Sequence, residues 1–425
     1  MKREKIIRDF FGSALFVFVI GCSQQPTQSI TIKNPYPFPL NNSCLVVERK
    51  MFNQNDNSLH PVIWDVNKKG VLPCQTDDLD DDGIWDELVI LISLKVDETF
   101  FGKIQWVKQK DTPKFQTHTN VYLGISRNRD GHFIEVQEEI FPPMYECKTP
   151  YQYQFEGVGW ENDVIAFRTY CDRRNGKDIF GKTTQEMILS NIGKIENYHE
   201  RQSWGMDILK VGNSLGIGAV GAIHDGVLYR LGDTQYHDFK CITEGPIRSI
   251  FKLGFDGWTV GSDTLSATET ITIIAGKNGF INQVVVTGEN VPDTLISGLS
   301  MIGINGEREW MKVEEFHGII LSGINDVDDH FLGMAIFTDH SEGFSARISP
   351  LESEIYDINR QDYKATKFHP FIADTYYLTT TGPAATFYVF AMWGNRYPEI
   401  ITPNMFKDKI TNEIRSLCLT PEVIL

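Results

Sequence analysis

The chain has 425 residues, with 56 acidic residues against 40 basic ones and a formal net charge of −16 at pH 7. A chain of this length can bury a large core and form two lobes. The acidic balance argues against a nucleic-acid partner, because the phosphate backbone would be repelled. For the same reason, an anionic sugar would need a local basic pocket.

The N-terminal residues have the pattern of an export signal. Four basic residues precede an apolar run that is too short to remain as a membrane-spanning helix. Gly21-Cys22 at the end of this run resembles a bacterial lipobox, which implies cleavage before Cys22 and lipidation of its thiol. We expect a signal peptide at 1–21, a lipidated tether at 22–28 and an outer-membrane location, since Ser23 follows the cysteine. The alternative is an ordinary cleaved signal.

Many short β-rich runs make up the remaining chain. Turn signals such as Asp225-Gly226 separate the runs, and few helical patterns lie between them. The pattern predicts an all-β fold, a large antiparallel β-sandwich of the supersandwich kind with a few short helices, rather than a parallel α/β sheet. We expect an N-terminal β region at 29–145 and the main β-sandwich at 146–425.

Two helices are predicted from capping signals. Thr183 and Glu186 fit a capping box ahead of apolar residues at helical spacing. Thr402 and Pro403 supply an N-cap and an N1 proline for a helix near the C-terminus. We expect this second helix to lie on the sandwich.

An acidic loop, residues 78–87, matches the first part of a calcium-binding loop. Oxygen-bearing residues alternate along it, and Gly83 allows the sharp turn at the sixth position. Val89 replaces the usual glutamate at the twelfth position, where Glu87 or a nearby aspartate can substitute. The alternative is a plain acidic turn. The pattern predicts a structural Ca²⁺ held by Asp78, Asp80, Asp82, Asp86 and the carbonyl of Ile84.

The segment 151–218 combines more ionisable, aromatic and glycine residues than any other stretch. Within it, residues 164–172 alternate like a strand, which places Arg168, Tyr170 and Asp172 on one face and an apolar set on the other. We expect the apolar face to pack on the core and the polar face to line a site. The alternative is a solvated strand end.

A basic segment follows this strand directly. Arg173, Arg174 and Lys177 gather cations in an otherwise acidic protein, where they can bind a carboxylate or a sulfate. A solvated loop is the alternative.

Further along, His199 can titrate near neutral pH, and Trp204 offers a flat face of the kind that stacks on sugar rings. A structural histidine is the alternative for His199. The sequence contains no HExxH motif, which argues against zinc hydrolases of that kind. Several carboxylates crowd the same region, so a pair for glycoside hydrolysis stays open.

Three blocks, at 78–89, 155–182 and 204–218, resemble a family of exported proteins long described as a domain of unknown function, found in bacterial polysaccharide-utilisation systems. The resemblance covers nearly the whole chain beyond the export signal. The chain is also similar to a protein of an ulvan-degrading system that acts as an oligosaccharide dehydratase. The resemblance implies a lyase that removes water from a uronic-acid-containing oligosaccharide and leaves a 4,5-unsaturated sugar. A glycoside hydrolase and a non-catalytic, calcium-stabilised glycan-binding lipoprotein are the alternatives.

Such an elimination removes the C5 proton next to a carboxylate, so it needs a cation for the carboxylate and a base for the proton. We assign the first role to Arg168 and the basic segment, and the second to Tyr170 or His199. Neighbouring cations would have to lower the pKa of Tyr170, whereas His199 could instead protonate the departing oxygen at C4. Asp172 would orient Arg168 or a sugar hydroxyl, and Trp204 would stack on a ring.

Overall fold

The computed structural model describes residues 28–68, 70–142, 147–194, 197–232, 234–340, 342–354 and 372–425. The predicted signal peptide and the lipidation site Cys22 lie outside the described residues, as does the tether up to residue 27.

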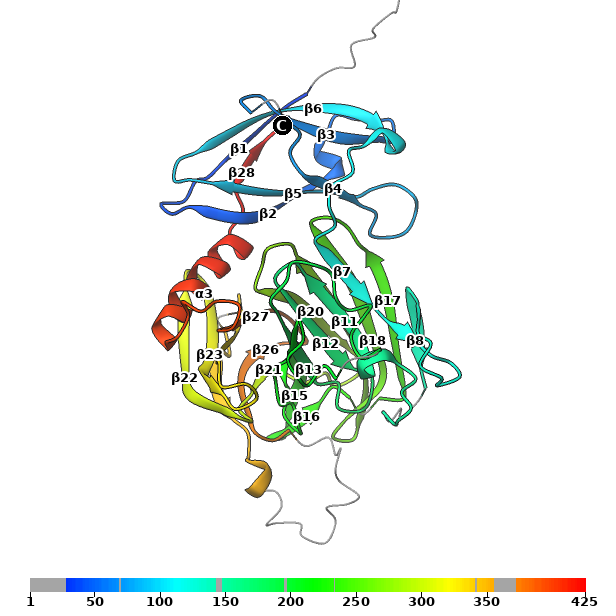
Figure 1. Cartoon of the computed structure of the whole chain (residues 1–425), viewed down its shortest axis with the longest axis vertical. Helices are drawn as coiled ribbons and strands as arrows, with labels where there is room; N and C mark the ends of the chain where they lie inside the picture. Colours follow the sequence, from blue (N-terminus) through cyan, green and yellow to red (C-terminus); the bar gives the residue numbers. More distant parts are fainter. Residues whose placement is uncertain are drawn as a thin grey trace, which may run out of the picture.

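A small N-terminal lobe consists of two sheets (Figure 1). One sheet contains, in spatial order, β28 (Glu422–Ile424), β1 (Gln28–Lys33), β6 (Thr99–Lys108) and β3 (Leu59–Asp65). The other contains β2 (Leu40–Glu48), β5 (Glu87–Leu94) and β4 (Cys74–Asp77). Alternating apolar residues of both sheets meet in a shared core around Trp85 and Trp106, as expected for strands with one buried face. Short 3₁₀ turns follow β2 and β6 at Arg49–Met51 and Gln109–Asp111.

The larger lobe is an antiparallel sandwich built on a nine-stranded sheet. Its strands are, in spatial order, β10 (Glu138–Phe141), β17 (Tyr236–Thr243), β18 (Arg248–Val260), β19 (Asp263–Ile274), β20 (Gly279–Thr287), β27 (Ala384–Trp393), β24 (Phe331–Thr338), β23 (Phe316–Asn325) and β22 (Ile304–Val313). The all-β prediction is therefore confirmed.

Two five-stranded sheets form the opposite layer. The first contains β14 (Gly205–Asp207), β13 (Lys177–Lys182), β12 (Ile165–Tyr170), β11 (Gly157–Asn162) and β7 (Thr119–Tyr122). The second contains β16 (Val227–Arg230), β15 (Ile217–His224), β21 (Thr294–Ser300), β26 (Thr375–Thr381) and β25 (Ser345–Ile348). A small ribbon, β8 (Gly124–Ile125) and β9 (Ile134–Glu135), and a 3₁₀ turn at Gln154–Glu156 complete the lobe.

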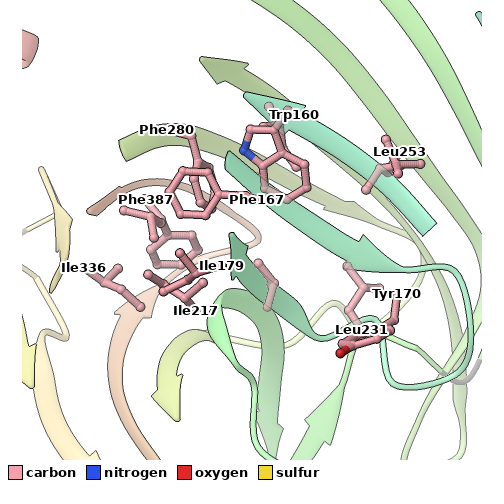
Figure 2. Packing of buried hydrophobic residues seen from close by; sticks show 14 of the residues in the cluster. Trp160, Phe167, Tyr170, Ile179, Ile217, Leu231, Leu253, Phe280, Ile336 and Phe387 are labelled. Atoms are coloured by element: carbon pink, nitrogen blue, oxygen red, sulfur yellow. The ribbon is translucent and has the colours of Figure 1, made fainter. Parts of the chain in front are cut away.

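Aromatic side chains fill the space between these layers (Figure 2). Trp160 on β11 and Phe167 on β12 pack against Phe280 on β20, with ring centroids 5.1 Å and 4.8 Å from it. Burying such large rings stabilises the sandwich and fixes the position of β12, which carries the predicted site.

Helix α3 (Pro403–Cys418) lies against the nine-stranded sheet, beside β22 and β23, and also contacts β2 of the small lobe (Figure 1). The side chain of Thr402 accepts a hydrogen bond from the backbone N–H of Met405, and Pro403 occupies the first turn. The predicted C-terminal helix is thus confirmed. Among the described residues, no helix has both the length and the apolar composition needed to cross a membrane.

The change from one lobe to the other lies earlier than the expected boundary at residue 145. β7 pairs with β11 and β10 pairs with β17, so the chain has entered the larger sandwich by residue 119. At its C-terminal end the chain returns to the small lobe, because the final strand β28 pairs with β1. Local composition does not report these long-range pairings, which explains why the sequence placed the boundary too late.

Candidate functional site

The first five-stranded sheet carries a buried group of charged residues centred on Arg168, which is 1% exposed. Its Nε and Nη2 atoms lie 3.1 and 2.7 Å from Oδ2 of Asp178, and Nη2 also lies 2.9 Å from Oδ2 of Asp207. Arg168 and Asp178 are direct cross-strand partners on β12 and β13, so their side chains leave the same face of the sheet. We call these three residues, with Tyr170 and Tyr198, the Arg168 cluster.

Two adjoining residues with left-handed backbone bring a carbonyl oxygen into the cluster. Phe155 and Glu156 have φ values of 40° and 68°, and the carbonyl of Phe155 accepts a hydrogen bond of 3.1 Å from Nη1 of Arg168. Every nitrogen of Arg168 thus has a partner within the protein. The expectation that Arg168 contacts a substrate carboxylate is therefore wrong for this structure, because internal acceptors surround its guanidinium group.

Tyr170 belongs to the core rather than to an open strand face (Figure 2). Its hydroxyl accepts a hydrogen bond from Arg168 and donates one to Asp178, each 2.8 Å long. Burial raises the pKa of Tyr170 well above its ordinary value, although the charge of Arg168 opposes this shift. The predicted role as a base with a lowered pKa is consequently wrong, since burial outweighs the neighbouring cation.

The two carboxylates of the cluster compete for one guanidinium group. Burial raises the pKa of Asp178 to about 6, and the nearby charge of Asp207 adds to the rise while Arg168 opposes it. A carboxyl that titrates near neutral pH inside a polar group is typical of functional sites. Asp178 is 1% exposed, however, so its carboxyl interacts with neighbouring side chains and does not contact a ligand in solvent.

His199 is where the cluster reaches the surface. Its side chain is 63% exposed, and its Nδ1 atom lies 3.3 Å from Oδ2 of Asp207. The hydrogen bond that His199 donates to Asp207 raises the pKa of His199 above its ordinary value. A carboxylate that holds Nδ1 leaves Nε2 to exchange protons with a ligand, which is the arrangement of a general acid or base. Of the residues predicted to be catalytic, His199 alone combines exposure with a carboxylate that orients it.

The basic segment after β12 divides between two sides of the sheet. Arg174 forms a two-pronged ion pair with Asp172 and lies 3.8 Å above the ring of Tyr170. Asp172 therefore orients Arg174, whereas we expected it to orient Arg168 or a sugar hydroxyl. Arg173 is half-buried beside it. Lys177 points into the sandwich, where its Nζ atom lies 2.7 Å from Glu269 and both side chains are fully buried. The expectation that Lys177 binds substrate is wrong, because the alternation of β13 turns it inward.

Trp204 is half-buried and forms part of a small apolar cluster. Its ring meets Phe180 edge to face, with centroids 6.1 Å apart. Ile188 and Leu189 belong to the same cluster, in the segment where a helix was predicted. That segment forms turns instead, and the buried carboxylate of Glu161 accepts hydrogen bonds of 2.8 and 2.9 Å from the N–H groups of Ile188 and Leu189.

Sequence reasoning missed a second polar group, which we call the Asp328 cluster. The carboxylate of Asp328 is 4% exposed and accepts hydrogen bonds from Arg201 and Trp393, with His330 also beside it. Arg201 additionally contacts Asn395. The sequence gives little signal for this group, because its members lie far apart in the chain and match no known spacing.

The acidic loop brings three of its predicted calcium ligands together. Carboxylate oxygens of Asp78, Asp80 and Asp86 lie within 4.8 Å of one another. The Asp82 carboxylate instead accepts a hydrogen bond of 2.7 Å from the N–H of Ile84. Glu87, the possible substitute ligand, is paired with Arg248. The donor set of oxygens fits a hard cation such as Ca²⁺.

A cavity of about 360 Å³ lies where the two lobes meet. It is lined by His60, Cys74, Lys114 and Glu244, among others. Burial lowers the pKa of His60. Its ring nitrogen Nδ1 lies 3.0 Å from the hydroxyl of Thr76, and among the described residues no carboxylate pairs with it. Burial also raises the pKa of Glu244 in the lining.

Comparison with solved structures gives weak similarities. One is to an alpha-mannosidase from Enterococcus faecalis, with a TM-score of 0.45 and 7% identity. Another is to a protein of glycosyl hydrolase family 38 from the same organism, with a TM-score of 0.43 and 7% identity. Each match covers 94% of this chain but only 46% and 47% of the two neighbours, so the chain spans less than half of their length. We draw no functional conclusion from similarities of this size.

Sequence comparison is more informative about descent. The chain is 26% identical over 332 residues to an uncharacterized protein, P7, from Formosa agariphila, a match that covers 72% of this chain and 74% of the relative. Residues 32–422 match the model of a family described as a domain of unknown function, DUF4861. The match includes both lobes and both polar clusters. The chain belongs to the DUF4861 family.

Proposed function

We propose that this protein is a carbohydrate-active lyase that removes water from uronic-acid-containing oligosaccharides, such as ulvan fragments, and leaves a 4,5-unsaturated uronate. The observation that carries the proposal is the pair of His199 and Asp207. An exposed imidazole is held at 3.3 Å by a carboxylate, and Arg168 fixes that carboxylate in turn at 2.9 Å. A histidine held in this way can move a proton on the open surface of the protein.

The chemistry assigns one proton path to His199. Neutral Nε2 takes the proton from C5, and the electrons of the C5–H bond form the C4=C5 double bond as the C4–O bond breaks. The departing hydroxyl takes the proton back from Nε2 and leaves as water, so no other reactant is needed. Asp207 stabilises the imidazolium formed between these two steps, and Arg168 holds Asp207 in place.

A glycoside hydrolase would need two carboxylates that face a sugar from opposite sides of the scissile bond. Asp178 and Asp207 resemble such a pair in one respect, because the pKa of Asp178 is raised. Both carboxylates, however, bind the same nitrogen of Arg168, and Asp178 is buried. This arrangement favours elimination by His199 over hydrolysis by the two aspartates.

The test is to incubate the wild-type protein and His199→Asn with ulvan and pectin oligosaccharides. New ultraviolet absorbance of an unsaturated uronate, together with the loss of one water by mass spectrometry, is expected for the wild type only. New reducing ends without this absorbance would replace the proposal with hydrolysis. Binding without either product would replace it with a glycan-binding role.

A further inference from the structure

The Asp328 cluster lies next to the His199–Asp207 pair, although its residues are distant in sequence. Arg201 follows His199 by two residues in the same loop and reaches Asp328 at 3.2 Å. Asn325, at the end of β23, donates a hydrogen bond to the carbonyl of Ile208, the residue after Asp207. The two clusters are therefore joined at both ends of the segment 199–208.

Close packing beneath the surface also joins the two clusters. Trp393 donates a hydrogen bond of 2.9 Å to Asp328, and its ring lies against Gly181. A Cβ atom at Gly181 would come within 2.6 Å of this ring. Gly181 is in turn the cross-strand partner of Met206, the neighbour of Asp207. The lack of a side chain at position 181 thus makes room for the Trp393 ring, which donates to Asp328.

Arg201 has the geometry of an anion-binding residue. Asp328 holds its Nη2 atom at 3.2 Å, Asn395 holds its Nη1 atom at 2.8 Å, and the guanidinium group lies 5.5 Å from the centroid of the Trp393 ring. A guanidinium group has five N–H bonds, and two of these have partners among the described residues. The side chain is 46% exposed, so Arg201 is accessible to a ligand.

Asp328 orients other donors besides Arg201. Oδ2 of Asp328, which pairs with Arg201, also accepts a hydrogen bond from Trp393. It lies 3.2 Å from Nδ1 of His330, whose side chain is 38% exposed. A carboxylate shared among three donors orients them, so the position of the Arg201 guanidinium group is fixed from below.

We propose that Arg201 is a specificity-determining residue that binds the carboxylate of a uronic acid, with Asp328 and Asn395 as its positioning residues. The planar guanidinium group of arginine can donate two parallel hydrogen bonds to a carboxylate. A neutral sugar cannot accept them in the same way. The inference rests on the proposed function, because it supplies the cation that neutralises the carboxylate beside C5 during elimination. It takes over the role that the sequence had assigned to Arg168.

The first test measures binding of D-glucuronate and D-glucose to the wild type, Arg201→Gln and Arg201→Lys. Arg201→Gln is expected to weaken glucuronate binding roughly tenfold or more and to leave the weak affinity for glucose unchanged. Arg201→Lys restores part of the binding, because lysine keeps the charge but not the fork. Arg127→Gln is the matched control, since Arg127 is exposed and pairs with Glu139 at a distant edge of the sandwich. Equal glucuronate binding by the wild type and Arg201→Gln would overturn the inference.

The second test separates this inference from the proposed function. If the wild type removes water from the oligosaccharide and Arg201→Gln does so with unchanged KM and kcat, Arg201 is not the carboxylate-binding residue and the lyase proposal stands. If Arg201→Gln loses glucuronate binding while the wild type makes no unsaturated product, the carboxylate subsite stands and the lyase proposal fails. Melting temperatures of all variants must match the wild type, which excludes loss of fold as the cause.

Discussion

The Nζ atom of Lys177 lies 2.7 Å from Oε1 of Glu269, and both side chains are completely buried between the layers of the sandwich. Glu269 also accepts a hydrogen bond from Asn282. Removing one member of such a pair leaves a charge in the core without a partner. Lys177→Met is therefore expected to lower the free energy of unfolding by about 3–5 kcal/mol, measured by urea denaturation.

Two further variants complete this prediction. Lys177→Met combined with Glu269→Gln should recover part of the loss, because no uncompensated charge remains. Lys108→Met is the control, since it breaks an exposed pair with Asp56 and should cost no more than about 1 kcal/mol. An unchanged unfolding free energy in Lys177→Met would mean that the pair does not form in solution.

The pH dependence of the reaction tests the pairing of His199 with Asp207. A protonated imidazole cannot accept the C5 proton, so kcat/KM should fall on the acid side as His199 becomes protonated. Asp207→Asn removes the interaction that raises the pKa of His199, so this fall should move to lower pH. His199→Asn should lower kcat by roughly 100-fold or more. An acid limb that stays in place in Asp207→Asn would contradict the pairing.

The same pair predicts how stability depends on pH. Because the folded state raises the pKa of His199 above that of the unfolded chain, its stabilising effect is complete below about pH 6.5 and disappears as the pH rises through the folded-state value. The difference in melting temperature between the wild type and His199→Asn should therefore be largest in mildly acidic buffer. A difference that grew with rising pH would contradict this sign.

We propose that the acidic loop binds one structural Ca²⁺ through Asp78, Asp80 and Asp86, whose oxygens already converge. An ion that binds only the folded state raises stability, by about 2.7 kcal/mol when it is present at 100 times its dissociation constant. Chelation should therefore lower the melting temperature of the wild type. Asp78→Asn should show a smaller effect, and the exposed-turn control Asp225→Asn should behave as the wild type. If chelation changes nothing and elemental analysis finds no metal, the loop is a plain acidic turn.

We also propose that Cys22 anchors the protein to the outer membrane. Cys22→Ser should move the protein from the membrane fraction to the soluble fraction, with no change in melting temperature, because the residue precedes the first strand at Gln28. Fractionation followed by immunoblotting measures this shift. Retention of the variant in the membrane fraction, equal to that of the wild type, would contradict a lipid anchor.

Local sequence signals located the elements around the site well. The alternation from residue 164 to 172 predicted the strand that became β12, and its apolar face does pack on the core at Phe167. Cap and proline signals located helix α3 at Pro403. These features depend on neighbouring residues along the chain, where the spacing of side chains alone determines the outcome.

Only the tertiary structure decided which polar residues meet and which reach solvent. Arg168 and Asp207 lie 39 positions apart, Lys177 and Glu269 92, and Arg201 and Asp328 127. The parity of a strand says which side chains share a face, but it does not say what covers that face. Turns and apolar side chains cover the polar face of β12, so the predicted open site became a buried cluster and left His199 at the surface. Pairing across sheets depends on strand order and layer packing, which no local pattern encodes.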